Sequence, residues 1–248
     1  MPPAVIIPTY NESDNIPSLV SQILALPGNS HVIVVDDNSP DGTGALVDEM
    51  AQTESRVHAV HRPAKMGLGT AHIAGMRRAF ELNFDPIISM DADFSHHPRY
   101  IPDLLTRLEH FDVVIGSRYV HGGGMQGRTL KLRFVSWGAN FFARTMLSLK
   151  AHDTTSGYRV YRRAVLESIN LDAVFSNGYS FLIEMLFLCQ AGGWRIGETP
   201  IVYEDRRAGT SKISRAEIYK ATYTVLRLTY RRMRSVKNTV LNRVGRAK

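Results

Sequence analysis

Cysteine, tryptophan and long hydrophobic runs are scarce in this sequence of 248 residues. Its one cysteine, Cys189, excludes an internal disulfide framework, and the apolar residues around it predict a buried, unreactive thiol. No run of about 18 apolar residues occurs, so the sequence predicts no transmembrane helix. The start of the chain lacks the charged and apolar regions of a secretory signal, and a cytosolic compartment fits the low cysteine content.

Two common nucleotide-binding motifs are also missing. The pattern G-x-G-x-x-G begins with Gly67 and Gly69, but His72 stands where the third glycine should fall, which argues against a dinucleotide-dependent dehydrogenase. No G-x-x-x-x-G-K-[ST] sequence exists, so a P-loop NTPase is excluded. The short glycine turn can still present backbone N–H groups to a ligand at the start of a helix.

The composition is otherwise that of an ordinary globular protein, with 44% hydrophobic and 21% charged residues. This length suits one large α/β domain or two small ones. The formal net charge is +7, and thirteen Lys or Arg lie between Arg206 and Lys248, with Glu217 as the one acid in that span. Such a basic segment usually meets phosphate groups, in nucleic acid, anionic lipid or a nucleotide.

Short β-rich stretches alternate with helix-like stretches in the first half of the chain. The pattern predicts strands over 4–12, 31–39, 56–62, 86–93 and 112–119, with helices over 15–26, 43–53, 67–82 and 101–108. This rhythm favours an α/β fold with a mostly parallel sheet. The second half predicts a glycine loop at 122–127, helices over 130–149, 160–169, 180–191 and 214–236, and a strand over 195–203.

Polar side chains follow four of the predicted strands. They are Thr9, Tyr10 and Glu12 after the first strand, Asp36 and Asp37 after the second, Asp91 and Asp93 after the fourth, and Ser117 and Arg118 after the fifth. The carboxyl ends of parallel strands form the edge of the sheet where ligands bind. We therefore expect a single ligand site at this edge.

Asp91 and Asp93 lie in the stretch MDADFSHHP and are the strongest candidates for a metal site. Alternate residues of a strand point to the same side, and two close carboxylates need a counter-charge to stay ionised. A Mg²⁺ or Mn²⁺ ion with a substrate pyrophosphate would supply it. The other interpretation is a solvated loop with a helix cap. His96 and His97 could add ligands, but we expect them to lie behind the coordinating acids, and a structural role fits His97 before Pro98 equally well.

Two further clusters have a functional and a plain structural interpretation. Asp37, and less strongly Asp36, are placed to accept hydrogen bonds from a ribose or a base, although Asn38, Ser39 and Asp41 could equally build a local turn around them. The stretch EDRRAGTSK at 204–212 could close over phosphate oxygens, or it could be a solvated basic turn.

Taken together, the motifs resemble the inverting family-2 glycosyltransferases, and among them the dolichyl-phosphate (polyprenyl-phosphate) mannosyltransferases. The resemblance covers residues 4–235 and rests on IPTYNE, VVDDNSPDGT, MGLGTA, MDADFSHHP, GSRYVHGGG, TSGYR and DRRAGTSK. It implies a GT-A fold in one catalytic domain over 1–236, with a nucleotide-binding half over about 1–119, an acceptor-binding half over about 120–236, and a basic tail at 237–248.

The same resemblance implies roles for individual residues. The nucleotide would contact Pro8, Tyr10, Glu12, Asp37 and Asp91, while Mg²⁺ or Mn²⁺ would bind Asp91 and Asp93, with Ser95 where some relatives have a third metal contact, Gln. The acceptor phosphate would contact Arg118, Arg133, Ser136, Arg206 and Lys212; relatives carry an arginine at the position of Leu132. The residues expected to act in catalysis are Asp93, Arg118, Arg206 and Lys212.

The implied reaction moves mannose from GDP-mannose to a polyprenyl (dolichyl) monophosphate with inversion, giving a β-mannosyl phosphate. The anionic acceptor phosphate would be its own nucleophile, which fits the lack of an obvious general base. A UDP-glucose-dependent glucosyltransferase stays open as an alternative, whereas the intact D-x-D and the pair Arg206 and Lys212 argue against an inactive regulatory homologue. A basic nucleic-acid-binding protein is disfavoured because no nucleic-acid-binding motif is present and the strand-end acids would repel phosphate.

A lipid acceptor requires contact with a membrane. In the last predicted helix, aromatic and apolar residues recur at steps of three and four beside a basic face; they are Tyr219, Tyr223, Leu226, Tyr230 and Met233, with Lys220, Arg227, Arg231 and Arg234. Packing in the protein core would explain the tyrosines equally well. For the aromatic stretch 134–146, core packing is at least as good an explanation as contact with a membrane. We expect a cytoplasmic enzyme peripheral on the cytoplasmic face of a membrane, with a small membrane-anchor subunit as a further partner.

Overall fold

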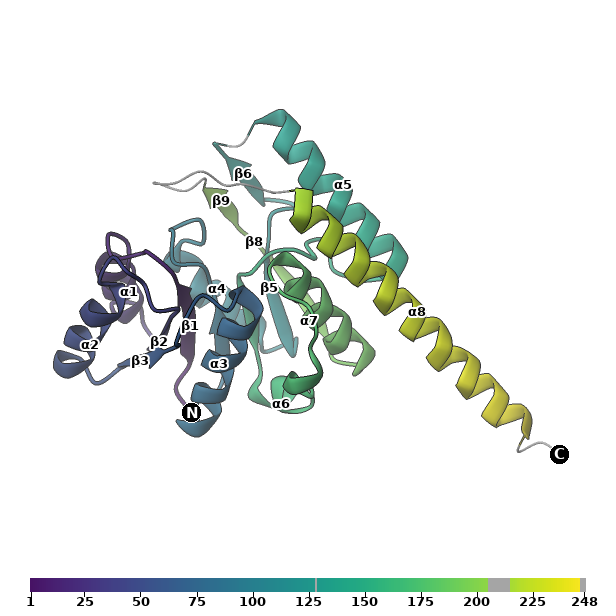
Figure 1. The fold of residues 1–248 in the computed structure, drawn as a ribbon, viewed down its shortest axis with the longest axis horizontal. Helices are drawn as coiled ribbons and strands as arrows, with labels where there is room; N and C mark the ends of the chain where they lie inside the picture. Colours follow the sequence, from purple (N-terminus) through teal and green to yellow (C-terminus); the bar gives the residue numbers. More distant parts are fainter. Residues whose placement is uncertain (128, 205–214, 246–248) are drawn as a thin grey trace.

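The structure is a computed structural model that describes residues 1–127, 129–204 and 215–245. The chain is built around a seven-stranded sheet, and Figure 1 shows how the helices surround it. The strand order is β3-β2-β1-β4-β7-β5-β8, and a separate pair is formed by β6 and β9. The strands are β1 (Ala4–Thr9), β2 (His31–Asp36), β3 (Val57–His61), β4 (Ile87–Ser89), β5 (Val113–Ser117), β6 (Gly124–Gln126), β7 (Arg159–Tyr161), β8 (Ile196–Pro200) and β9 (Val202–Glu204).

Apolar helices cover both faces of the sheet because its strands are hydrophobic on both sides. In β1, Val5 and Ile7 face a core shared with α1 (Ile16–Leu24), α2 (Thr43–Thr53) and α4 (Ile101–Arg107). The alternate residues Ala4 and Ile6 face a core shared with α3 (Leu68–Glu81), α6 (Arg163–Glu167) and α7 (Tyr179–Ala191). Two single 3₁₀ turns, η1 (Pro98–Tyr100) and η2 (Leu171–Ala173), complete these layers.

The fold confirms the α/β class with a mostly parallel sheet and corrects the expectation in the second half of the chain. Residues 159–161 form β7, which runs antiparallel between β4 and β5, so the helix predicted over 160–169 shortens to α6. The strand predicted over 195–203 is two strands, β8 and β9. β9 pairs with β6, a strand within the predicted glycine loop.

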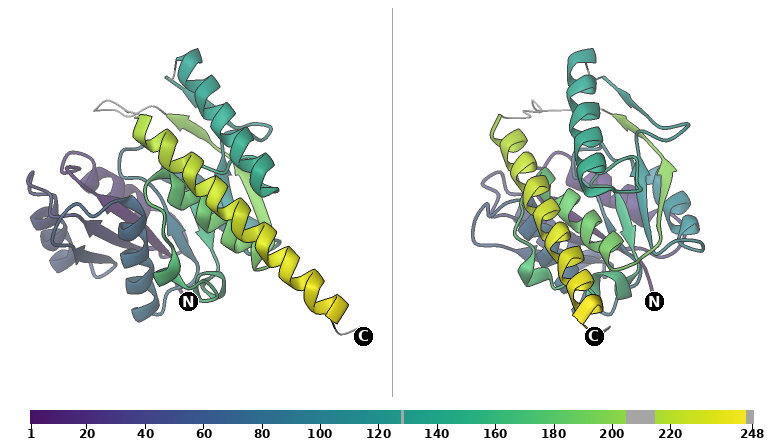
Figure 2. Two further views of the ribbon diagram at one scale, coloured as in Figure 1. Left: turned by 45° about the vertical axis from the view of Figure 1, so that its right-hand side comes forward. Right: turned by 90° about the vertical axis from the view of Figure 1, so that its right-hand side faces the viewer.

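A third layer lies outside α7 and consists of two long helices, α5 (Leu130–Leu147) and α8 (Arg215–Gly245), which run side by side in all views (Figure 2). They bury Ala143, Leu147, Val225 and Leu228 against α7. The helix predicted over 214–236 thus continues to Gly245, through most of the expected tail, and its last turns extend away from the body. In the described part of the chain, no helix is long and apolar enough to cross a membrane.

Candidate active site

The carboxyl ends of β1, β2, β4 and β5 lie at one edge of the sheet and carry the polar residues singled out from the sequence. β4 ends at Ser89, so Asp91 and Asp93 lie in an irregular bend rather than on the strand, and Phe94 between them and Ser95 takes a positive φ of 62°. Strand alternation therefore does not set the orientation of the two acids, contrary to the prediction. They are brought to the edge by the bend.

The bend places the two carboxylates in different surroundings. The Asp91 side chain is 32% exposed and lines a pocket, whereas Asp93 is buried and accepts a hydrogen bond from the Ser95 backbone N–H at 3.0 Å. The Asp91 backbone N–H donates to His96 Nδ1 at 3.1 Å, and this ring lies buried against Tyr158. His96 thus supports the bend through this hydrogen bond.

His97 serves the local backbone. It caps η1, because its Nδ1 accepts a hydrogen bond from the Arg99 backbone N–H at 3.2 Å.

The residues of this bend fit a divalent cation. The Ser95 hydroxyl is buried and has no hydrogen-bond partner in the described part of the chain, so its oxygen is available to a ligand. A Cβ at Gly157 would lie 3.3 Å from Asp91 Oδ1, so only a glycine leaves this carboxylate its full space. The described residues hold no cluster of three or more acidic, histidine or cysteine ligands, so an ion here would take its remaining oxygens from substrate and water, as Mg²⁺ commonly does.

Asp37, after β2, is the buried acid that was predicted to contact the nucleotide. Its Oδ1 lies 3.2 Å from Arg62 Nη1, and its Oδ2 accepts a hydrogen bond from the Met66 backbone N–H at 3.3 Å. Burial raises the pKa of Asp37, and Arg62 beside it offsets part of the rise. Arg62 was not predicted as a site residue, because it stands at the end of a predicted strand and its partner Asp37 lies in another loop.

Asp36 belongs to a local turn, which was the structural alternative to nucleotide binding. It is buried, and Thr9 and Ser39 donate hydrogen bonds to its carboxylate, which closes the turn after β2.

The other predicted nucleotide contacts line the open side of the same edge. Tyr10 is partly exposed, and the Lys65 ammonium lies 3.9 Å above its ring centroid. Glu12 accepts a hydrogen bond from the Asn15 side chain at 2.7 Å, and Pro8 is half-buried in β1. These residues lie near one another, and a flat base could stack on the Tyr10 ring.

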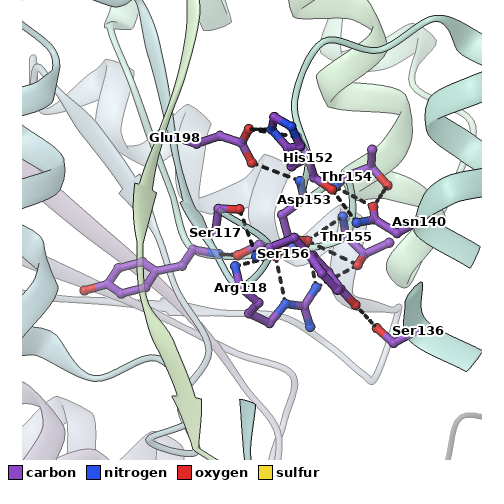
Figure 3. A network of polar contacts seen from close by, with 12 residues as sticks. Ser117, Arg118, Ser136, Asn140, His152, Asp153, Thr154, Thr155, Ser156 and Glu198 are labelled. Carbon is purple, nitrogen blue, oxygen red and sulfur yellow. Dashed lines mark hydrogen bonds and ion pairs between the residues drawn. The ribbon is translucent and has the colours of Figure 1, made fainter. Parts of the chain in front are cut away.

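Arg118, after β5, is held by a buried carboxylate that the sequence analysis did not identify (Figure 3). Asp153 accepts hydrogen bonds from Arg118 Nε and Nη2, both at 2.8 Å, and from its backbone N–H at 3.0 Å. Burial alone would lower the pKa of Arg118, but the Asp153 charge outweighs it and the pKa lies above its ordinary value. The ion pair with Asp153 fixes the position of the Arg118 guanidinium, and Arg118 Nη1 takes no part in the hydrogen bonds to Asp153.

The segment that carries Asp153 is itself fixed from two sides (Figure 3). Asn140 of α5 accepts hydrogen bonds from the Thr154 backbone N–H at 2.8 Å and hydroxyl at 2.5 Å, and donates to the His152 carbonyl. Glu198 of β8 accepts from the backbone N–H groups of His152 and Asp153 at 2.8 and 2.9 Å. Only the fold reveals these partners, because they are distant in sequence.

A pocket of about 430 Å³ opens beside this network. Its polar end contains Asp91, His96, Arg118, Ser136 and Thr155. Its walls are mostly apolar and come from three helices: Phe134, Val135, Ala139, Phe142 and Ala143 of α5, Leu182 and Ile183 of α7, and Ala221 and Val225 of α8. The pocket can therefore take a ligand with a charged head and an apolar body.

The predicted acceptor-phosphate residues divide into three groups. Arg118 and Ser136 meet in this pocket, where the Ser136 hydroxyl lies 2.8 Å from the Tyr119 hydroxyl (Figure 3). Arg133 is exposed on the first turn of α5 and is not among the described residues that line the pocket. Arg206 and Lys212 lie outside the described residues.

The outer faces of α5 and α8 are apolar and exposed, so these side chains do not pack in the core of the described part of the chain. Trp137 is 51% exposed and its ring stacks on Phe141, with centroids 5.6 Å apart. On α8 the exposed set is Tyr219, Tyr223, Leu226, Tyr230 and Met233. The core contacts of α8 are instead made by other residues, Val225 and Leu228 among them.

Cys189 of α7 is buried, as predicted, and burial raises the pKa of its thiol to about 12.

Comparisons with known proteins agree with this geometry. The sequence model of Glycosyl transferase family 2 matches residues 4–169. The chain is 43% identical over 222 residues to an undecaprenyl-phosphate mannosyltransferase of Micrococcus luteus, covering 90% of this chain and 91% of the relative. It is 43% identical over 223 residues to a polyprenol monophosphomannose synthase of Mycolicibacterium smegmatis, covering 89% and 84%.

Solved structures share the fold at lower identity. A glucosyl-3-phosphoglycerate synthase from Mycobacterium tuberculosis, in complex with Mn²⁺, UDP-glucose and phosphoglyceric acid, superposes with a TM-score of 0.63 at 20% identity, over 92% of this chain and 79% of that one. A mannosyl-3-phosphoglycerate synthase from Rubrobacter xylanophilus gives 0.64 at 18% identity, over 96% and 75%. The chain belongs to glycosyl transferase family 2 and has the GT-A fold, as the motifs predicted.

Proposed function

We propose that this chain transfers mannose from GDP-mannose to a polyprenyl (dolichyl) monophosphate with inversion at the sugar carbon. Relatives that are 43% identical over about nine tenths of the chain carry the names undecaprenyl-phosphate mannosyltransferase and polyprenol monophosphomannose synthase. The observation that carries the proposal is the pocket with a charged end and apolar walls. A phosphoglycerate-like acceptor would leave the walls from α5, α7 and α8 without a partner.

The reaction needs no strong general base. The phosphate of a polyprenyl monophosphate is anionic at neutral pH, so one of its oxygens can attack the sugar directly. The new bond forms between this oxygen and C1, the bond from C1 to the diphosphate breaks, and its electron pair leaves with GDP. No proton has to move, and in-line attack inverts C1. The protein then contributes alignment and charge stabilisation.

Each part of the site has a proposed task in this reaction. Arg118, fixed by Asp153, and the Ser136 hydroxyl would bind the acceptor phosphate at the polar end of the pocket. Pro8, Tyr10, Glu12 and Asp37 would bind the nucleoside of the donor, with Asp91 near its phosphates. Arg206 and Lys212, outside the described residues, are proposed to close on the phosphate groups, and Arg133 to assist from the start of α5.

Asp91, Asp93 and Ser95 would hold a Mg²⁺ or Mn²⁺ ion, which would supply positive charge to the departing diphosphate. The Ser95 hydroxyl, which has no hydrogen-bond partner among the described residues, and the close approach of Gly157 to Asp91 support this assignment. Mn²⁺ is present with a uridine nucleotide in solved structures of the same fold.

We also propose that the outer faces of α5 and α8 lie on the cytoplasmic face of a membrane. The exposed aromatic residues of both helices flank the pocket in which the lipid chain would lie. The basic side chains Lys220, Arg227, Arg231 and Arg234 stand beside them on α8, and each adds about 1 kcal/mol near an anionic lipid surface. A small membrane-anchor subunit would reinforce this attachment.

The test is a transfer assay with purified protein, Mg²⁺ or Mn²⁺, and a polyprenyl phosphate in vesicles. Radiolabelled GDP-mannose and UDP-glucose are supplied in parallel, and the label that enters the organic phase is counted. We expect label from GDP-mannose alone, and none after EDTA treatment. Label from UDP-glucose alone would retain the acceptor and overturn the donor. Label that enters only a water-soluble acceptor such as phosphoglycerate would overturn the lipid acceptor.

A further inference from the structure

The glycine turn at Met66–Gly69 connects the two halves of the site. On one side it meets the proposed nucleotide site, because the Met66 backbone N–H donates to Asp37 and Arg62 Nη1 lies 3.5 Å from the Gly67 carbonyl oxygen. On the other side Leu68 lines the acceptor pocket. A displacement of this turn would therefore reach both ligands.

One side chain from a distant part of the chain holds this turn. Asn177, in the segment that leads into α7, accepts a hydrogen bond from the Gly69 backbone N–H at 2.9 Å and donates to the Met66 carbonyl at 3.2 Å. The amide thus spans the turn from its first residue to its last. The same Oδ1 accepts from the Gly178 backbone N–H at 2.8 Å, at the start of α7.

Gly67 makes this contact possible. Its φ is +101°, and a Cβ at this position would lie 2.0 Å from Asn177 Nδ2. A side chain here would therefore meet both an unfavourable backbone conformation and a direct clash with Asn177. A glycine at position 67 therefore allows the Asn177 amide to pack against the turn. This packing, rather than dinucleotide binding, explains the glycine pattern at Gly67 and Gly69.

The segment that carries Asn177 is anchored in turn. Glu184, fully buried in α7, accepts hydrogen bonds from the backbone N–H groups of Phe175 and Ser176 at 3.2 and 2.9 Å. The Arg227 guanidinium of α8 lies 3.9 Å from the centroid of the Phe175 ring. Tyr179, two residues after Asn177, lines the acceptor pocket. The segment thus touches the acceptor pocket, the helix with the exposed aromatic face, and the donor turn.

We propose that Asn177 is a positioning residue that holds the Met66–Gly69 turn against Asp37 and so makes donor binding depend on the acceptor side of the protein. This inference rests on the proposed function, because the turn belongs to the proposed donor site. Asn177 acts through the turn and touches neither substrate. Its removal takes away the acceptor of the Gly69 N–H and one of two donors to the Met66 carbonyl, which keeps the Thr70 hydroxyl at 3.1 Å, so the turn is held less firmly relative to Asp37.

The experiment compares Asn177→Ala with Asn170→Ala, a matched control whose side chain caps η2 and does not contact the turn. Nucleotide affinity is measured by calorimetric titration of GDP, and separately of UDP, in the presence of Mn²⁺ and without any acceptor. We expect Asn177→Ala to weaken binding of the nucleotide that the wild type prefers by about tenfold. Asn170→Ala is expected to bind as the wild type does.

Two further measurements separate a positioning role from a general loss of structure. Amide hydrogen exchange, with no ligand present, should become faster at residues 66–70 in Asn177→Ala while the strands of the sheet keep their protection. In a double-mutant cycle, Asp37→Asn combined with Asn177→Ala should bind nucleotide no more weakly than Asp37→Asn alone, because both act through one contact.

Unchanged exchange at 66–70, or losses that multiply in the double variant, would overturn the inference. These readouts use nucleotide and exchange alone. A failure of the lipid transfer assay would therefore contradict the proposed function without deciding the role of Asn177.

Discussion

At the scale of single residues, the site depends on a few buried polar groups whose partners are far away in sequence. Arg118 was predicted from its motif, but Asp153 was not, because nothing in the sequence indicates that a residue 35 positions later neutralises it. Breaking such a buried pair leaves an uncompensated charge, whereas replacing both partners is tolerated better. The Arg118–Asp153 pair therefore allows stability and activity to be separated.

Asp153→Asn should lower the free energy of unfolding by about 3 kcal/mol, because Arg118 then stays buried without a counter-ion. The double variant Arg118→Met with Asp153→Asn should regain part of that stability in urea unfolding. Both variants should lose most transfer activity, because the proposed phosphate contact is displaced or gone. Recovery of activity along with stability in the double variant would show that Arg118 serves structure alone.

Gly157 offers a second test at this scale. A Cβ there would lie 3.3 Å from Asp91 Oδ1 and 3.5 Å from His96 Cε1, so the carboxylate has to shift by a few tenths of an ångström. Gly157→Ala should raise the Mn²⁺ concentration needed for half-maximal activity on the order of tenfold, with little change in thermal stability. Gly124→Ala, where a Cβ meets nothing within 4 Å, is the control. Equal metal dependence in both variants would argue against metal binding at Asp91.

At the scale of elements, the first half of the chain could be predicted well and the second half could not. Strands and helices up to β5 follow clear apolar periods, and their order dictates a parallel sheet. β7 has three residues, too few for a period to show, and its antiparallel place between β4 and β5 depends on contacts across the fold. Likewise, the aromatic residues of α8 have the same spacing in the sequence whether their face of the helix is buried or exposed, so the sequence alone could not distinguish the two.

The exposed faces of α5 and α8 can be tested through tryptophan fluorescence, because the chain has two tryptophans. Trp137 lies on the outer face of α5, while Trp194 donates its indole N–H to Ser168 at 3.0 Å. In Trp194→Phe, emission from Trp137 should shift to shorter wavelength when anionic vesicles are added. In Trp137→Phe, the remaining Trp194 should show no shift. The same shift in both variants would contradict docking through α5.

At the scale of the whole molecule, the edge with the candidate site lies beside α5 and α8, whose outer faces carry most of the large hydrophobic side chains exposed in the described chain. One pocket joins the two regions, and its lining residues range along the chain from Leu68 to Val225. The motifs that follow β1, β2, β4 and β5 predicted a site at this edge, but they could not place the helices over it. Helix positions depend on apolar packing, which many sequences satisfy equally.

The stability of the molecule should depend on pH through histidines that fold into apolar surroundings. His72 of α3 is fully buried and stacked on Phe181, and burial lowers its pKa to about 3. The unfolded chain takes up this proton near pH 6.5 and the folded chain does not. Between pH 6.5 and about 3, falling pH therefore favours unfolding, by up to about 1.4 kcal/mol per pH unit for one proton.

His72→Phe should keep the stacking contact and remove this proton uptake, so its stability should fall less steeply than that of the wild type between pH 6.5 and 4. Burial also lowers the pKa of His31 and His58, so part of the slope should remain. Urea unfolding at several pH values gives the slopes directly. The two ring nitrogens of His72 have no hydrogen-bond partner among the described residues, so the variant should be at least as stable as the wild type at pH 7.5. Parallel slopes for the two proteins would show that His72 is protonated equally in the folded and unfolded states, and that its burial does not control the acid stability of the fold.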